Sequence, residues 1–440
     1  MSPRIRFSAL AALAITAALP AHAAQRPGDT LTSSYEVEGV RVIHRSVPSN
    51  DIVAVNLYFL GGSRQVTFDN AGIEPLLLAA SERGTAQLTR EDLRRALARS
   101  GSSIVIDVDA DWTVFGLRTT TRSFREVWPA FAARVVTPTL SMNDVATVRD
   151  QFVASLMQRR DSPEVWAEHL ADSVAFAGHP YGIDPEGTVR SVASLTHEQL
   201  RAYHRDQFVR SRLMLVVVGN VERRDLEQLV RSTLGRLPAG SYVWTLPDTL
   251  PRRPAAVHRE ARALPTNYVI GYAPGPRADH PDYDALRVAS GIVSGQLFAE
   301  VRSRLALSYA VAAPFRERAV GAVGLYVSTT DPVAALNAMR AEIRALQDAI
   351  VDQESLTPLL QQFITEYFLN NETNAAQADL LARSQLYQGD WRRSSALMQS
   401  LRAVTPADIQ RVMRGYFRNL SFAYVGDPRR LPDSAIQVWR

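Results

Sequence analysis

The feature that most constrains the fold of this chain is an internal duplication. Thr196 opens a segment that leads to the apolar run 213–218 and a glycine, and Thr405 opens a second segment that leads to the apolar run 420–425 and a glycine. In each copy a Gln or Asp follows the threonine by three residues, which is the pattern of a capped helix N-terminus. Each helix then leads into a buried strand. Two such units predict two homologous domains.

A second pair of segments supports the duplication. Residues 52–60 are followed by Gly-Gly-Ser-Arg at 61–64, and residues 268–273 are followed by Pro-Gly-Pro-Arg at 274–277. Both pairs are typical of a strand followed by a turn.

The stretch between the two copies is rich in proline and lacks a hydrophobic period, particularly over 237–254. We therefore expect an N-terminal domain over 24–240, a linker over 241–262 and a C-terminal domain over 263–440.

Strands and helices alternate irregularly within each half. Segment 104–119 is long enough for two strands or one bent strand, and segments 309–315 and 322–328 predict a hairpin. Helical spacing is found in four further segments: 124–136, 164–176, 332–350 and 356–370. The sequence therefore predicts an α+β fold in which sheet and helices form separate layers.

The first residues have the layout of a cleavable secretory signal peptide. Arg4 and Arg6 precede the apolar run 7–19, and Ala-His-Ala at 21–23 provides the small-residue cleavage pattern. The apolar run is shorter than the ~20 residues that a spanning helix needs, which disfavours the alternative of an uncleaved anchor. We expect residues 1–23 to be removed and the protein to be periplasmic, without stable membrane insertion.

Composition excludes several classes of protein. The chain has no cysteine, so its stability must come from core burial, for which a hydrophobic content of 46% is sufficient. All of its basic residues are arginines, and they alternate with acidic residues, as in 90–95. The net charge is only +4, and no basic patch of one sign suggests nucleic-acid binding.

Several motifs, in order along the chain, resemble the insulinase and pitrilysin family of zinc peptidases. They are Gly61-Gly62-Ser63-Arg64, Gly72-Ile73, Gly84-Thr85, Asp161-Ser162-Pro163, His179-Pro180-Tyr181-Gly182, Gly187-Thr188, Ala263-Leu264-Pro265-Thr266, Pro281-Asp282-Tyr283, Leu297-Phe298-Ala299-Glu300-Val301-Arg302 and Leu307-Ser308-Tyr309. The chain is most similar to the short bacterial members and the mitochondrial processing peptidases. The resemblance implies two homologous domains, each a mainly antiparallel or mixed sheet with helices packed on one side. Together they would form a half-clamshell, and two chains would close a chamber.

The resemblance also shows where a zinc site would be. In the family, the helix after the Gly-Ile pair carries H-x-x-E-H, in which two histidines bind zinc and the glutamate is the general base. Pro75, Leu78 and Ala79 occupy these positions here, and Ala154 and Ser155 occupy the region of the third ligand, a glutamate. Zinc needs lone pairs from imidazole, thiolate or carboxylate, so we expect no metal in this chain.

The family's contribution from the second domain is retained. Arg302 and Tyr309 match the arginine and tyrosine that hold the substrate backbone and the oxygen of the tetrahedral intermediate in active members. Both side chains are hydrogen-bond donors at neutral pH, as that role requires. Outside the family, such a pair is more often a surface arginine and a core aromatic. One position departs from the family pattern, because Ala306 replaces a glycine at the end of the helix before Tyr309.

These observations predict the non-catalytic, zinc-free subunit of a periplasmic heterodimeric zinc metallopeptidase. Arg302 and Tyr309 would serve a homologous partner that carries H-x-x-E-H and the zinc, with peptides as substrates. The alternative is a stand-alone peptide-binding or scaffold protein whose sheet edges hold extended peptides. An independent hydrolase is disfavoured, because the chain has no cysteine nucleophile, no lysine for a Ser-Lys pair and no G-x-S-x-G elbow.

Other candidate ligands are weaker. Asp107, Asp109 and Asp111 alternate, which is more typical of the solvated face of a strand than of a cation site. Glu74 and Glu82 are too far apart to chelate a metal from one helical turn. His169, His197 and His204 lack ligand spacing and are interpreted as surface or capping residues.

Overall fold

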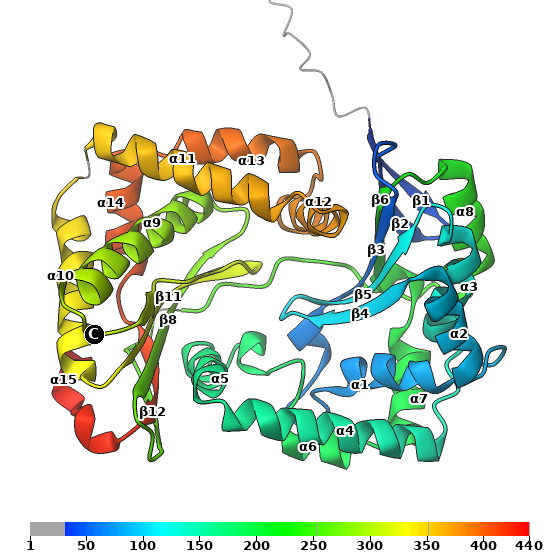
Figure 1. The fold of residues 1–440 in the computed structure, drawn as a ribbon, viewed down its shortest axis with the longest axis horizontal. Helices are drawn as coiled ribbons and strands as arrows, with labels where there is room; N and C mark the ends of the chain where they lie inside the picture. Colours follow the sequence, from blue (N-terminus) through cyan, green and yellow to red (C-terminus); the bar gives the residue numbers. More distant parts are fainter. Residues whose placement is uncertain (1–30, 252, 351, 440) are drawn as a thin grey trace, which may run out of the picture.

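The computed structural model describes residues 31–251, 253–350 and 352–439, so the expected signal peptide over 1–23 lies outside the described residues. Two sheets face each other, and most of the helices lie on the outer side of each sheet (Figure 1). The predicted α+β half-clamshell of two homologous domains is confirmed.

The first sheet has six strands in the order β1-β2-β6-β3-β5-β4, in which β2 and β6 are parallel and the other neighbours are antiparallel. Its central strands, β3 and β6, are buried over almost their whole length because both faces of this sheet are covered. The strands are β1 (Thr32–Val37), β2 (Val40–Ser46), β3 (Ile52–Leu60), β4 (Ser103–Val108), β5 (Trp112–Thr120) and β6 (Leu213–Gly219).

The second sheet repeats this topology. Its order is β10-β11-β8-β12-β7, with β9 also paired to β11, and its parallel pair, β12 and β7, corresponds to β6 and β2. The strands are β7 (Val257–Ala261), β8 (Asn267–Arg277), β9 (Ala310–Ala312), β10 (Phe315–Arg316), β11 (Val320–Thr329) and β12 (Ser421–Gly426).

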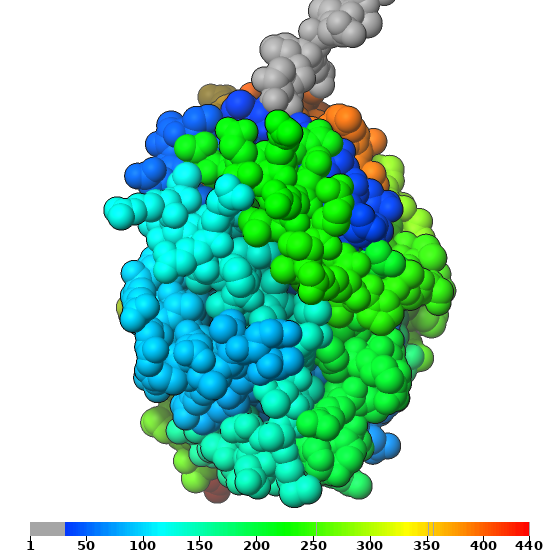
Figure 2. Space-filling view, turned by 90° about the vertical axis from the view of Figure 1, so that its right-hand side faces the viewer, coloured from blue at the N-terminus to red at the C-terminus, as the bar shows by residue number. Residues whose placement is uncertain are grey.

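The helices that lead into β6 and β12 begin as the duplication predicts. Thr196 and Thr405 each cap their helix with a full capping box, completed by Gln199 and Asp408. The helices of the N-terminal half are α1 (Ile73–Ala80), α2 (Arg90–Ser100), α3 (Phe124–Val136), α4 (Met142–Asp161), α5 (Pro163–Ala175), α6 (Val189–Ser194), α7 (His197–Gln207) and α8 (Arg223–Ser232). Those of the C-terminal half are α9 (Asp282–Leu297), α10 (Pro332–Asp348), α11 (Gln353–Asn370), α12 (Asn374–Gln388), α13 (Arg393–Arg402), α14 (Pro406–Tyr416) and α15 (Asp433–Gln437). Figure 2 shows the outer face of the N-terminal half, a continuous surface of residues from that half.

Each half covers the inner face of its own sheet with a helix from the other half. Leu170 of helix α5, and Phe176 just beyond the end of this helix, pack against Ile270 and Tyr272 of the second sheet. Helix α12 packs Leu381 and Tyr387 against the first sheet. Burial of a large apolar side chain contributes about 1.5–3 kcal/mol to stability. Helices α5 and α12 therefore stabilise the contact between the two halves.

Two details differ from the sequence prediction. The expected turn over 274–277 is strand, because β8 continues to Arg277 opposite an irregularity in β11, where a proline is tolerated. The expected linker over 241–262 ends in β7, which pairs with β12 and belongs to the second sheet. The linker is also fixed in place, since Trp244 Nε1 donates to the carbonyl of Leu386 at 2.8 Å.

Candidate functional site

The helix that would carry a zinc site, α1, occupies a defined place in the N-terminal half. It begins after Gly72, whose φ of 92° is left-handed, and a Cβ there would lie 2.7 Å from the carbonyl oxygen of Glu186. Only glycine fits this position. Helix α1 packs against α4, so the two segments that would supply zinc ligands are neighbours.

The side chains at these positions cannot hold zinc. Pro75 and Leu78 are buried and Ala79 is partly buried, while Ala154 and Ser155 lie exposed on α4. Three of the side chains are hydrocarbon, one is the proline ring, and the single hydroxyl of Ser155 is not a usual zinc ligand. Within the described ranges, no group of three His, Asp or Glu side chains is arranged to hold a metal ion.

Glu74, the carboxylate next to these positions in sequence, stabilises the fold. Glu74 is buried and forms an ion pair with Arg212 Nη2 at 2.7 Å, and it accepts a hydrogen bond from the Tyr203 hydroxyl at 3.0 Å. Arg212 also donates to the carbonyl of Leu60 at 2.7 Å. Burial raises the pKa of Tyr203 far above its ordinary value, so the phenol remains a donor. Glu74 therefore links α1 to the first sheet.

Arg302 and Tyr309 lie together in the C-terminal half. Arg302 belongs to the π-helix η6 (Phe298–Arg304), which continues α9, and its guanidinium carbon lies 4.3 Å from the ring centre of Tyr309 and 4.7 Å from that of Phe298. These distances are typical of cation–π contacts. Tyr309 is 79% exposed, so its hydroxyl is available to another molecule.

The turn between the two residues is held firmly. The hydroxyl of Ser308 is 2.7 Å from the carbonyl oxygen of Ala310 and 2.8 Å from that of Ser328. Ala306 has a left-handed φ of 50°, a conformation that favours glycine. Ala306 thus holds this turn at the cost of local strain.

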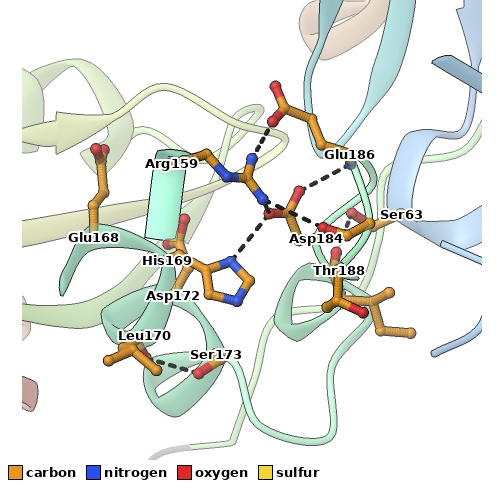
Figure 3. A network of polar contacts seen from close by, with 12 residues as sticks. Ser63, Arg159, Glu168, His169, Leu170, Asp172, Ser173, Asp184, Glu186 and Thr188 are labelled. Carbon is orange, nitrogen blue, oxygen red and sulfur yellow. Dashed lines mark hydrogen bonds and ion pairs between the residues drawn. The ribbon is translucent and has the colours of Figure 1, made fainter. Parts of the chain in front are cut away.

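A polar network at the boundary of the two halves was not predicted from the sequence. It lines a cavity of about 520 Å³ formed by α5, residues 182–186 and residues 315–318. Arg159 contacts both Asp184, at 2.8 Å, and Glu186, and His169 Nδ1 lies 3.0 Å from Asp184 Oδ2 (Figure 3). Burial opposes ionisation of Asp184, but the contacts with His169 and Arg159 outweigh it and lower its pKa.

Two acids join this network to the second sheet. Asp172 on α5 pairs with Arg318 at 2.7 Å and Arg316 at 3.1 Å. Asp111 accepts hydrogen bonds from the hydroxyls of Tyr181 and Tyr387 and from the backbone N–H of Ala319. These contacts connect segments from both halves.

The network corrects two interpretations made from the sequence. Asp111 is not on a solvated strand face; it lies in the turn between β4 and β5 and is 0% exposed, because residues of α12 and of the turn before β11 cover it. His169 is not a plain surface residue, since it stacks on Trp166 and contacts Asp184. His197 pairs with Glu198, and His204 Nε2 lies 2.8 Å from the carbonyl oxygen of Val135.

Comparisons with known proteins agree with this architecture. A family model described as the peptidase M16 inactive domain matches residues 194–363. An uncharacterised zinc protease of Mycobacterium leprae is 25% identical over 62% of this chain and 63% of its own length, and one of Mycobacterium tuberculosis is 24% identical over 86% and 88%. The β subunit of the mitochondrial processing peptidase of Lentinula edodes is 23% identical over 58% of this chain and 56% of that protein.

Solved structures share the fold. The structure described as the peptidase M16 inactive domain from Pseudomonas fluorescens superimposes with a TM-score of 0.81 at 18% identity, covering 90% of this chain and 98% of the other. A protease from Helicobacter pylori gives a TM-score of 0.83 at 17% identity, covering 90% and 99%.

The fold and the site define a two-domain peptidase-like half-clamshell whose zinc-ligand positions carry no ligands. The chain is similar to the insulinase-like M16 peptidase family over residues 194–363 and shares the fold of its solved members, and it lacks H-x-x-E-H. None of the helices in the described part of the chain is both long and apolar enough to cross a membrane.

Proposed function

We propose that this chain is the non-catalytic subunit of a heterodimeric zinc metallopeptidase and supplies Arg302 and Tyr309 to the active site of its partner. One observation carries the proposal. The chain has no side chain that could bind zinc at the zinc-ligand positions of α1, yet it presents the Arg302–Tyr309 pair on an exposed surface. A member that had lost all part in peptide hydrolysis would have no catalytic use for that pair.

The chemistry of the pair suits oxyanion stabilisation. Peptide hydrolysis places negative charge on the carbonyl oxygen of the scissile bond, and preorganised donors stabilise that charge. Tyr309 would donate its hydroxyl hydrogen to this oxygen, and Arg302 would hold the substrate backbone. The stacking of Arg302 on Tyr309 and the fixed turn at Ser308 limit the rotation of both side chains. Reduced mobility is what preorganisation requires.

The partner would be a homologous chain with H-x-x-E-H, and it would hold the zinc. A subunit role is in line with a relative whose name describes it as one subunit of a processing peptidase. We place the complex in the periplasm on the basis of residues 1–23, which lie outside the described residues.

The test of this proposal is the substitution Tyr309→Phe in the purified complex. The substitution removes one hydroxyl from an exposed side chain, so assembly and zinc content should stay the same while the peptidase rate falls by about 100-fold, the scale expected for loss of one oxyanion donor. Tyr268→Phe on β8 is the matched control and should leave the rate unchanged. An unchanged rate in Tyr309→Phe would overturn the proposal.

The second candidate function is a peptide-binding scaffold, and one observation favours it. Strand β4 is one of the two edge strands of the first sheet, and its side chains alternate between exposed and partly buried. Such an edge can accept an extended peptide as an additional strand. A stable homodimer that binds unfolded peptides without a partner would favour the scaffold over the composite enzyme.

A further inference from the structure

A cavity of about 450 Å³ in the C-terminal half is separate from the sites described above. It lies between the first turn of α9, helix α13 and the beginning of α14, and the last residue of α12 also contributes to its lining. Among the described residues, none that lines this cavity also lines the polar cavity between the two halves, and neither Arg302 nor Tyr309 is part of its lining. The proposed function therefore assigns no role to this cavity.

Most of the charged side chains in this lining already have partners. Asp279 contacts Arg277 through both carboxylate oxygens, each at 2.7 Å. Arg411 contacts Asp282 at 2.7 Å and also contacts Asp408. The charges of these side chains are balanced within the protein, so they do not require a ligand.

Asp284 and Arg393 also line the cavity, but neither side chain has a hydrogen-bond or ion-pair partner in the described part of the chain. Asp284 is partly exposed and Arg393 is exposed, so a molecule in the cavity can contact both. Burial raises the pKa of Asp284. Arg287 opposes this rise, but its guanidinium contacts Glu317. The Asp284 carboxylate is therefore partly desolvated without an ion-pair partner of its own.

The ends of the two helices explain only one of these charges. Asp284 stands in the first turn of α9, where the partial positive charge of the helix N-terminus favours a carboxylate. Arg393 is the first residue of α13, where the same effect disfavours a cation. A carboxylate from another molecule would compensate the positive charge at this position.

We propose that this cavity binds a small zwitterion, such as a free amino acid, whose ammonium group contacts the Asp284 carboxylate and whose carboxylate contacts the Arg393 guanidinium. Hydrogen bonds between ionised groups are stronger than those between neutral groups. A ligand with a single charge would compensate only one of the two side chains, whereas a zwitterion compensates both. The carbon chain of the ligand lies against the apolar lining, which includes Ala285 and Val404. This inference does not rest on the proposed function in peptide hydrolysis.

The experiment measures the Kd of small probes for the isolated full chain by ligand-observed NMR titration at neutral pH. Glycine, γ-aminobutanoate and ε-aminohexanoate are zwitterions that differ in the separation of their two charges, while butylamine and butanoate each carry one charge. We expect at least one zwitterion to bind saturably, with a Kd at least about tenfold below that of either singly charged probe, because it makes two charge-assisted contacts. Absence of saturable binding by all three zwitterions, or equally tight binding of a singly charged probe, would overturn the assignment.

Arg393→Gln locates the binding site. The side chain is exposed, so the variant should fold as before, and the Kd of the tightest zwitterion should rise about tenfold through the loss of one charged contact. Arg392→Gln is the matched control, because Arg392 is the neighbouring exposed arginine, contacts Asp390 and does not line the cavity. Asp284→Asn keeps the size of the side chain and should raise the Kd by a similar factor. Equal Kd values in Arg393→Gln and Arg392→Gln, or an unchanged Kd in Asp284→Asn, would refute the site. These measurements use neither the partner subunit nor the peptidase rate, so failure here is distinguishable from failure of the composite enzyme.

Discussion

The substitution Asp111→Ala should weaken the contact between the two halves of the chain and lower the free energy of unfolding. Asp111 is 0% exposed, and its carboxylate accepts from Tyr181 at 2.5 Å, from Ala319 N–H at 2.7 Å and from Tyr387 at 2.8 Å. Tyr181 belongs to the N-terminal half, whereas Ala319 and Tyr387 belong to the C-terminal half. One side chain therefore satisfies donors from both.

The magnitude follows from these contacts. Alanine would leave three buried donors without an acceptor, and each unsatisfied donor costs about 1–3 kcal/mol. The loss is partly offset, because the substitution also removes a charge that is costly to bury. We expect a net loss of about 3 kcal/mol in the free energy of unfolding, which corresponds to a change of more than about 100-fold in the folding equilibrium.

Urea unfolding followed by circular dichroism and tryptophan fluorescence measures this loss. The matched control is Asp107→Ala on β4, where the side chain is exposed and the change should stay within about 0.5 kcal/mol. A loss in Asp111→Ala no larger than that of the control would refute the reasoning that Asp111 connects the halves.

Three further predictions concern single sites. Glu74→Leu should cost about 3–5 kcal/mol because it leaves the Arg212 guanidinium buried without its partner, and the double variant Glu74→Leu/Arg212→Met should recover most of that loss in the same unfolding assay. Ala306→Gly should raise the free energy of unfolding by about 1 kcal/mol by relieving the left-handed φ; a lower thermal midpoint would contradict this. Burial and the nearby Asp109 raise the pKa of Asp111, so the free energy of unfolding is highest below the unfolded pKa and decreases as the pH rises through the folded pKa, although the hydrogen bonds to the carboxylate remain. Asp111→Asn should remove this decrease. Urea unfolding at several pH values measures it, and a free energy of unfolding that falls with pH as steeply in Asp111→Asn as in the unchanged protein would contradict the prediction.

The local features of the fold could be predicted because they depend on neighbours in sequence. The caps at Thr196 and Thr405 are set by residues three positions on, and helix α3 has the predicted bounds of 124–136. One error of this kind, the turn at 274–277, arose because β-strand pairing with β11 overrides the local preference of proline and glycine.

The polar network could not be predicted, because it depends on contacts between distant residues. Tyr181 and Tyr387 are 70 and 276 positions from Asp111, and no spacing rule connects them. The exchange of α5 and α12 between the halves has the same origin, since the apolar face of a helix indicates burial but not the sheet that covers it.

The candidate site was partly accessible from the sequence. The positions Pro75, Leu78 and Ala79 show which donors are missing, and the structure adds that Glu74 beside them is engaged with Arg212. The contact between Arg302 and Tyr309 required the structure, because it depends on the π-helical turn and on Ala306.

The central claim is that this chain lacks a metal centre of its own and acts on peptides only through a partner. Metal analysis of the isolated chain, together with a peptidase assay with and without chelator, tests it most directly. The account predicts substoichiometric zinc and no chelator-sensitive cleavage until a subunit with H-x-x-E-H is added. One zinc per chain with chelator-sensitive cleavage by the chain alone would contradict it.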